Sequence, residues 1–272
     1  MPVTKESDAR KTPGKERLDR LLVEASLARS REEAQRYILA GAALVDDRPV
    51  TKVGTLVPRG SRLRVKAPPR YASRGGEKLE AALGHYGVEP AGRVALDVGA
   101  STGGFTDCLL AHGAARVHAV DVGYGQLDWR LRQDARVAVM ERTNIRHLEP
   151  GALTERPDLA VVDVSFISLR LVLPRVCLLL SRPFELLALI KPQFEVGKGK
   201  VGKGGVVRSE EEHRRVIGEI EEAADALGLA RAPVFQSPLL GPKGNREFFI
   251  HCRSGAVSPP GSNAAGGLDL GG

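Results

Sequence analysis

The chain has 272 residues, 42% of them hydrophobic, which is enough to build a core and excludes a chain that is disordered throughout. Three widely spaced cysteines exclude a disulfide framework and favour a cytoplasmic environment, while the charged start and the short apolar runs exclude a signal peptide and a membrane span. The net charge of +7 is concentrated in residues 1–75, which indicates a polyanion-binding module or, equally, a basic surface that only aids solubility.

The first quarter of the chain predicts a small α+β unit over residues 16–67. Leucines at helical spacing predict a first helix, and Ser30 with Glu33 forms a capping box for a second one. Two β-rich segments joined by turns follow, which gives an α-α-β-β order. The two ends of the chain, 1–15 and 254–272, are polar and aperiodic or rich in glycine and proline, so we expect both to be disordered.

A linker, 68–74, begins with two prolines and leads into a predicted α/β domain over residues 75–253. After a first helix from Lys78 to about Gly84, five runs rich in Val, Leu and Ile predict buried strands. Most of the intervals between them are long enough for crossover helices, which favours a parallel sheet with helices on both faces. A capping box at Ser209 predicts a further helix, and two final strands bring the expected number to seven.

A glycine-rich turn follows the first of these strands and precedes a helix. Its sequence, from Asp97 to Phe105, is DVGASTGGF, and glycine lets the backbone of such a turn approach a ligand at a helix N-terminus. The next strand leads to Asp121, 22 residues after Gly99, close to the spacing at which a carboxylate meets a ribose hydroxyl. We therefore expect a cofactor that contains a nucleoside; a tight turn without a ligand is the alternative.

The carboxylate of Asp97 favours one kind of cofactor. It would repel a pyrophosphate and attract a cation, so the electrostatics fit the amino group and sulfonium of S-adenosylmethionine better than a nicotinamide dinucleotide. A second glycine-rich segment, 197–204, has Gly204 where a phosphate-binding loop needs Ser or Thr. We interpret its lysines, among them Lys198, as RNA contacts on a lid or as part of a solvated loop.

Seven motifs occur in a characteristic order. They are SRGGEKL (73–79), DVGASTGGFT (97–106), DVGYGQL (121–127), ERTN (141–144), DVSFIS (163–168), KPQFEVGK (191–198) and NREFF (245–249). In this the chain resembles the TlyA ribosomal-RNA 2′-O-methyltransferases, within the wider FtsJ-like ribose methyltransferases. The N-terminal unit, with LARSREEA (27–34), resembles the small RNA-binding domain named after ribosomal protein S4, although Ala42 and Ala43 replace the basic residue that often follows its glycine.

The resemblance implies a fold and a set of catalytic residues. The fold is α/β, a seven-stranded Rossmann-like methyltransferase with a small N-terminal α+β RNA-binding domain. The Lys-Asp-Lys-Glu set of the family falls on Lys78, Asp163, Lys191 and Glu247. Asp163 and Lys191 each end an apolar strand, at the edge of an open α/β sheet where ligands bind, so the sequence also supports a shared cleft.

We hypothesise that Lys191 removes the proton of the ribose hydroxyl, with its pKa lowered by the neighbouring ammonium of Lys78. Lys78 would stabilise the alkoxide or orient Lys191, and the carboxylates of Asp163 and Glu247 would position both ammonium groups. For each of the four, an ordinary surface charge is the alternative.

Two further sets complete the candidate site. The expected cofactor-binding residues are Asp97, Gly99, Ser101, Gly103, Gly104, Phe105, Asp121, Asn144 and Asp163. Of these, Asn144 is expected at the adenine, and Phe105 fits the core equally well. The expected RNA-binding residues are Arg17, Arg29, Arg31, Arg70, Arg74 and Lys198. No metal is expected.

The sequence therefore favours a cytoplasmic enzyme that uses S-adenosylmethionine to methylate a cytidine ribose in ribosomal RNA, with ribosomal RNA or ribosomal subunits as its partner. In the family the target lies in the large subunit and in some members also in the small one. The alternatives are a catalytically silent RNA-binding or assembly protein, a nicotinamide enzyme, and a membrane-active hemolysin. The last is disfavoured because the best amphipathic helix carries glutamates on its polar face.

Overall fold

The computed structural model describes residues 14–66, 70–197, 201–202 and 204–255, and it divides into two compact units. Unit 1 is Met1–Arg74 and unit 2 is Gly75–Gly272. Most of the two ends expected to be disordered, and the two prolines of the expected linker, lie outside the described residues. Lys15, expected in the first tail, belongs to the first strand, and Ser254, expected in the second, is buried and accepts a hydrogen bond from the backbone N–H of Phe184.

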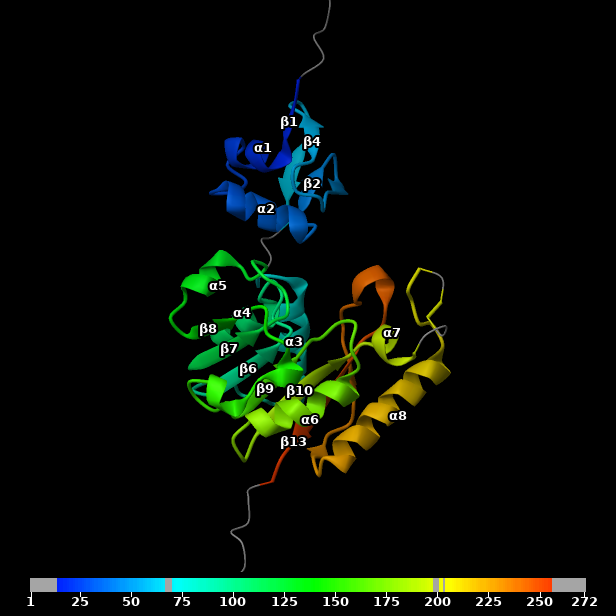
Figure 1. Ribbon diagram of the computed structural model, residues 1–272. Helices are drawn as coiled ribbons and strands as arrows, with labels where there is room; N and C mark the ends of the chain where they lie inside the picture. The colour runs from blue at the N-terminus through cyan, green and yellow to red at the C-terminus, as the bar shows by residue number, and fades with distance from the viewer. Residues whose placement is uncertain (1–13, 67–69, 198–200, 203, 256–272) are drawn as a thin grey trace, which may run out of the picture. The chain divides into compact units, whose positions relative to one another are not determined.

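Within its described residues, 14–66 and 70–74, unit 1 forms two helices and five short strands around one small core. Figure 1 shows this unit in blue to cyan. The helices are α1 (Leu18–Glu24) and α2 (Arg31–Leu39), and the strands are β1 (Lys15–Arg17), β2 (Ala43–Val45), β3 (Arg48–Pro49), β4 (Leu56–Pro58) and β5 (Leu63–Val65). β1 pairs with β4, and β2 lies between β3 and β5, all antiparallel. The expected α-α-β-β order is thus incomplete, because strands of two or three residues are too short to show a period of two in the sequence.

The predicted capping box at the start of α2 is present in a modified form. The Ser30 hydroxyl accepts a hydrogen bond from the backbone N–H of Glu33 at 3.2 Å. The Glu33 carboxylate in turn accepts from the backbone N–H of Arg29, at 2.6 Å, one residue before the position it takes in a standard box. The side chains of Ser30 and Glu33 therefore both fix the backbone at the N-terminus of α2.

Unit 2 is built on a single mixed sheet with the strand order β11-β13-β10-β9-β6-β7-β8, and β12 also pairs with β13 (Figure 1). The strands are β6 (Val94–Val98), β7 (Arg116–Val120), β8 (Val137–Met140), β9 (Leu159–Val162), β10 (Glu185–Ile190), β11 (Ala230–Arg231), β12 (Phe235–Gln236) and β13 (Phe248–Arg253). The five strands from β6 to β10 are parallel, as expected, and β13 runs antiparallel to β10.

Among the described residues the sheet has eight strands rather than the expected seven, because the segment before β13 is split into β11 and β12. Pro233 lies between the two pieces and has no N–H to donate to the ladder. The register also shifts by one residue there: Ala230 pairs with Arg253, whereas Phe235 pairs with Phe249. The interruption is therefore a bulge at the edge of the sheet.

Helices cover both faces of this sheet, as expected. They are α3 (Arg74–Tyr86), α4 (Gly104–Ala111), α5 (Trp129–Gln133), α6 (Leu169–Leu179), α7 (Pro192–Glu195) and α8 (Glu210–Ala226), with short 3-10 turns at Ile145–His147, Pro150–Ala152 and Pro242–Gly244. α6 and α8 bury their apolar stripes against one face. On the other face, Phe105 of α4 stacks on Phe249 of β13.

One helix, α3, is longer than expected. α3 extends beyond both predicted ends, since the Gly-Gly pair in its first turn is tolerated inside the helix, and Arg74 of the expected linker is its first residue. Among the described residues, no helix combines the length and apolar composition needed to cross a membrane.

Candidate active site

The turn between β6 and α4 is the expected glycine-rich segment. Gly99 and Gly103 have φ angles of 89° and 93°, in the region that residues with side chains rarely adopt. A Cβ on Gly99 would overlap the backbone carbonyl oxygen of Asp163, and one on Gly103 would overlap the side chain of Leu131. Both positions therefore require glycine, and the turn lies directly against the end of β9.

Asp97 is fully buried just before this turn. One carboxylate oxygen, Oδ2, accepts a hydrogen bond from the hydroxyl of Thr106 at 2.6 Å. The other, Oδ1, has no hydrogen-bond partner among the described residues. Burial raises the pKa of Asp97 to about 7, the Thr106 hydrogen bond opposes that shift, and the charge of Asp163 adds to it. The unpartnered oxygen is suited to a cationic donor such as the ammonium group of S-adenosylmethionine, so the residues present fit that cofactor.

Asp121 follows β7 and borders a pocket beside the glycine-rich turn. Its two carboxylate oxygens accept hydrogen bonds from the backbone N–H of Ser101 at 2.8 Å and of Gly123 at 2.6 Å. These bonds fix the carboxylate at the mouth of the turn, and each oxygen keeps acceptor capacity for a ribose hydroxyl. The pocket is lined by Ala100, Ser101, Ala119, Asp121, Gly123, Gln126, Leu127, Val139 and Glu141.

Sequence reasoning did not identify Gln126 as part of this pocket. Its amide lies next to Gly123, where a Cβ would overlap its Nε2, and its Oε1 is 3.4 Å from the hydroxyl of Ser101. The sequence does point to Gln126, because this residue belongs to the DVGYGQL motif that begins with Asp121.

The remaining expected cofactor residues are placed as follows. Gly104 is the buried first residue of α4. Phe105 is only 3% exposed, and its ring centroid lies 6.2 Å from that of Phe249, so its side chain belongs to the core. Asn144 accepts a hydrogen bond from the backbone N–H of Arg146 at 3.1 Å and caps the 3-10 turn after β8.

The four expected catalytic side chains form two ion pairs. Lys191 Nζ lies 2.5 Å from Asp163 Oδ1, and Lys78 Nζ lies 2.5 Å from Glu247 Oε2. Glu247 is fully buried, and Lys78 and Lys191 are nearly so. Each carboxylate thus holds one of the two ammonium groups.

Sheet topology brings these residues to one edge. Asp163 follows β9 and Lys191 follows the neighbouring strand β10. Glu247 precedes β13, and the register that pairs Ile190 with Phe248 sets Glu247 opposite Lys191. Lys78 reaches Glu247 from α3. Since Asp163 also packs against Gly99, the two ion pairs and the glycine-rich turn border one site.

Phe166 is a second feature that sequence reasoning missed. Its side chain is 89% exposed, and its φ angle of 64° is unusual for a bulky residue. It lies in the loop after Asp163, and its ring centroid is 4.8 Å from that of Phe194. Lys191 Nζ is 6.0 Å from the Phe194 ring. A strained backbone thus holds an apolar ring in solvent against Phe194, which is itself close to Lys191.

Glu195 and Asn245 fix the loops around this edge. The nearly buried carboxylate of Glu195 accepts hydrogen bonds from the Ser168 hydroxyl at 2.6 Å and from the backbone N–H of Leu169 at 2.8 Å. The amide of Asn245 accepts from the backbone N–H of Val207 and donates to the carbonyl of Gly205. Both residues lie in the motifs quoted from the sequence, but their roles depend on contacts between segments far apart in the chain.

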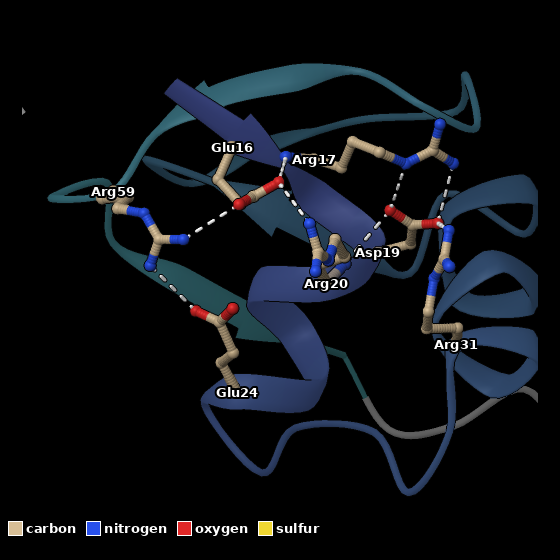
Figure 2. A network of polar contacts seen from close by, with 7 residues as sticks. All are labelled: Glu16, Arg17, Asp19, Arg20, Glu24, Arg31 and Arg59. Atoms are coloured by element: carbon tan, nitrogen blue, oxygen red, sulfur yellow. Dashed lines mark hydrogen bonds and ion pairs between the residues drawn. The ribbon is translucent and has the colours of Figure 1, made fainter. Parts of the chain in front are cut away.

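In unit 1 two of the expected RNA-binding arginines share one partner. Figure 2 shows Arg17 and Arg31 converging on the carboxylate of Asp19. Arg29 is exposed, two residues before α2 begins. The first two are therefore held in place within the unit, whereas the side chain of Arg29 projects into solvent.

The other three expected RNA-binding residues are less defined. Arg70 is exposed and places its guanidinium 5.4 Å from the centroid of the Tyr71 ring. Arg74 is exposed at the start of α3. Lys198 lies outside the described residues. Within the described part of the chain, no group of three or more His, Cys, Asp and Glu side chains is arranged to hold a metal ion.

An open α/β sheet with a glycine-rich turn after its first parallel strand and an acid after the second is typical of S-adenosylmethionine-dependent methyltransferases. Two family profiles match the chain: FtsJ-like methyltransferase over residues 71–254 and S4 domain over residues 16–63. The protein therefore belongs to the FtsJ-like methyltransferase family and carries an N-terminal S4 domain, which confirms the resemblance inferred from the sequence.

Individual relatives agree with this assignment. The chain is 48% identical to the 16S/23S rRNA (cytidine-2′-O)-methyltransferase TlyA of Mycobacterium tuberculosis, over 88% of this chain and 90% of that one. It is 36% identical to the 23S rRNA (cytidine-2′-O)-methyltransferase TlyA of Campylobacter jejuni, over 66% and 70% of the two chains. A solved structure of a hemolysin-named protein from Streptococcus thermophilus matches with a TM-score of 0.70 and 40% identity, covering 90% of each chain.

Proposed function

We propose that this methyltransferase uses S-adenosylmethionine to methylate the 2′-hydroxyl of a cytidine in large-subunit ribosomal RNA, with small-subunit ribosomal RNA as a second candidate substrate. The observation that carries the proposal is the convergence of the Asp163–Lys191 and Lys78–Glu247 ion pairs on the edge that also bears the glycine-rich turn. The 48% identity to a relative named for this reaction supports the choice of substrate.

Three acceptor groups are suited to hold the cofactor. The unpartnered oxygen of Asp97 would accept from its amino group, Asp121 would accept from its ribose hydroxyls, and Asn144 would meet its adenine. When bound, S-adenosylmethionine supplies a methyl group on a positively charged sulfur. Gly99 and Gly103 leave the backbone of the turn free of side chains where the cofactor would approach.

Lys191 is the proposed base. It would take up the proton of the ribose 2′-hydroxyl as that oxygen receives its methyl group. Asp163 and the Ser165 hydroxyl, 3.0 Å from Nζ, hold that nitrogen in a fixed direction. Lys78, anchored by the buried Glu247, would supply positive charge to the developing alkoxide.

Phe166 would position the nucleotide. The 2′-hydroxyl of a ribose reaches the nearly buried amine of Lys191 only when its nucleotide is unstacked from the RNA. The unstacked nucleobase then needs an apolar surface to pack on. The exposed ring of Phe166, beside Phe194 and the Asp163–Lys191 pair, offers such a surface. Stacking of this kind does not depend on base identity, so it would hold the cytidine without selecting it.

The test is transfer of labelled methyl groups from S-adenosylmethionine to separated ribosomal subunits from cells that lack this activity, followed by mapping of the modified ribose. Lys191→Ala is the variant expected to lose transfer while it keeps cofactor binding. Arg214→Ala, which removes an exposed positive charge from α8, is the matched control and is expected to remain active.

Each outcome of this test has a distinct meaning. Label in large subunits alone indicates one target, and label in both subunits indicates two. Near wild-type turnover of Lys191→Ala would contradict its role as base. No label in either subunit, despite cofactor binding, would favour the catalytically silent RNA-binding alternative.

A further inference from the structure

Asp19 in α1 is a charged residue with an unusual environment. Its side chain is fully buried, and its carboxylate accepts five hydrogen bonds. Arg17 supplies two of them, from Nε at 3.0 Å and from one terminal nitrogen at 2.9 Å. The others come from Arg31 at 3.2 Å, Gln35 at 3.1 Å and the backbone N–H of Arg20 at 3.1 Å. A carboxylate accepts about four hydrogen bonds, so this one is saturated and serves only the side chains around it.

Both guanidinium groups on this carboxylate remain open to solvent. The side chain of Arg17 is 39% exposed and that of Arg31 is 52% exposed, although they share a fully buried partner. Arg17 also lies against the turn at Gly54, where a Cβ would be 3.4 Å from its other terminal nitrogen. One edge of each guanidinium is therefore fixed while the remainder faces outward.

The neighbouring ion pairs of unit 1 differ in both charge and burial (Figure 2). Arg59 contacts Glu16 at 2.9 Å and Glu24 at 3.1 Å, and Arg20 contacts Glu16 at 3.6 Å. These two arginines are balanced by two carboxylates. At Asp19, two arginines face one carboxylate, so a positive charge is left over at that point of the surface.

We propose that Asp19 is a positioning residue that presets Arg17 and Arg31 as a clamp for phosphate groups of the RNA substrate. The inference rests on the proposed function, because ribosomal RNA is the polyanion that unit 1 would meet. Arginine offers a planar set of donors that matches phosphate oxygens. Since Asp19 already holds both side chains, they lose little rotational freedom when they bind, which is the main cost of engaging long side chains at an interface.

A variant of Asp19 separates this role from simple electrostatics. Asp19→Asn keeps the shape of the side chain but removes its negative charge, so the clamp becomes more positive and less ordered. If charge alone governed binding, the variant would bind RNA more tightly. If positioning governs it, the variant binds about tenfold more weakly, and the dependence of log affinity on log salt becomes shallower by about one.

Asp47 provides a matched control. It is a half-exposed carboxylate in unit 1 that also contacts two arginines, Arg62 at 3.4 Å and Arg64 at 2.9 Å. Asp47→Asn removes the same charge from the same unit, and we expect equal or tighter binding. Because a buried Asp19→Asn change is able to unfold unit 1, Arg31→Lys, with Arg64→Lys as its control, forms a second pair at exposed positions in which no charge is altered.

The experiment uses the full-length protein and purified large ribosomal subunits that lack the modification. Affinity is measured between about 50 and 200 mM salt, where phosphate contacts dominate binding, alongside thermal unfolding and initial rates of methyl transfer over a range of subunit concentrations. We expect Asp19→Asn and Arg31→Lys to raise KM with little change in kcat, and Asp47→Asn and Arg64→Lys to leave KM unchanged or, for Asp47→Asn, lower.

The failure of this inference is distinguishable from that of the proposed function. If the wild-type protein neither binds nor methylates subunits, the proposed function is wrong and the clamp is rejected with it. If the wild type is active and folded Asp19→Asn binds subunits as tightly as wild type with the same salt dependence, Asp19 has only a structural role. Where Asp19→Asn is unfolded, unchanged binding by Arg31→Lys overturns the proposal.

Discussion

The buried carboxylate of Asp97 gives the proposed cofactor site a pH dependence that binding measurements are able to resolve. Burial raises its pKa to about 7, so half of the cofactor-free protein carries a protonated Asp97 near neutral pH. A protonated carboxyl does not attract an ammonium group, and an α-amino group keeps its own proton below about pH 7.7. Affinity for S-adenosylmethionine is therefore expected to fall as the pH falls below 7.

The size of the effect follows from the fraction of Asp97 that is ionised. With a pKa of about 7, this fraction drops from about one half at pH 7 to about one eleventh at pH 6, so affinity falls about fivefold, and the slope approaches tenfold per pH unit below that. Isothermal titration calorimetry with S-adenosylmethionine or its demethylated product measures it directly.

Two variants are expected to change the pH dependence of cofactor affinity in different ways. Asp97→Asn removes the titrating group, so its weaker binding is expected to be independent of pH between 6 and 7. Thr106→Val removes the hydrogen bond that lowers the pKa of Asp97, so the midpoint is expected to move to higher pH. If wild-type affinity is constant across this range, or if Thr106→Val moves the midpoint downward, the assignment of Asp97 to the ammonium group is wrong.

Four further predictions follow from the same contacts. Native Asp97 binds its proton up to a higher pH than the unfolded chain does, so the unfolding free energy of the cofactor-free protein is expected to fall from about pH 4 to pH 7 and to level off above, in thermal unfolding scans, whereas Asp97→Asn shows no such loss. Phe166→Ala is expected to lower kcat/KM for ribosomal subunits about five- to a hundredfold without a loss of Tm, and unchanged transfer kinetics would contradict the stacking role. Lys78→Met leaves Glu247 buried without its cation and is expected to cost about 3–5 kcal/mol in denaturant unfolding, which Lys78→Met with Glu247→Gln should largely restore. Gly99→Ala forces a Cβ onto the end of β9 and is expected to abolish cofactor binding in calorimetry and to lower Tm.

Much of the fold was predictable because it depends on local patterns. The buried strands from β6 to β10 are apolar runs that end in polar turns, and the helix caps at Ser30 and Ser209 use side chains within three residues of each other. In unit 1, β1 and β4 were not predictable, and neither was the split before β13, because pairings of two or three residues depend on the partner strand and not on their own sequence.

The candidate site was likewise predictable only where it depends on local sequence patterns. Motif order identified which residues gather at the edge of the sheet and that carboxylates would position the lysines, but it did not show which carboxylate pairs with which lysine. Phe166 and Glu195 stand inside motifs that were quoted in full, yet only the exposed ring of the first and the buried carboxylate of the second indicate a role. Exposure and burial are properties of the folded chain, so no spacing rule reveals them.

The buried carboxylates of the two units differ in how fully they are hydrogen-bonded, and this difference predicts what each one does. Asp19 accepts five hydrogen bonds and has no acceptor capacity left, so it acts on the arginines around it. Asp97 and Glu247 each have one oxygen without a partner among the described residues. An uncompensated buried acceptor costs stability, and such a cost is retained where a ligand or a reacting group offsets it. On this reasoning the saturated carboxylate orders a binding surface, and the two unsaturated ones belong to the site where cofactor and substrate would meet.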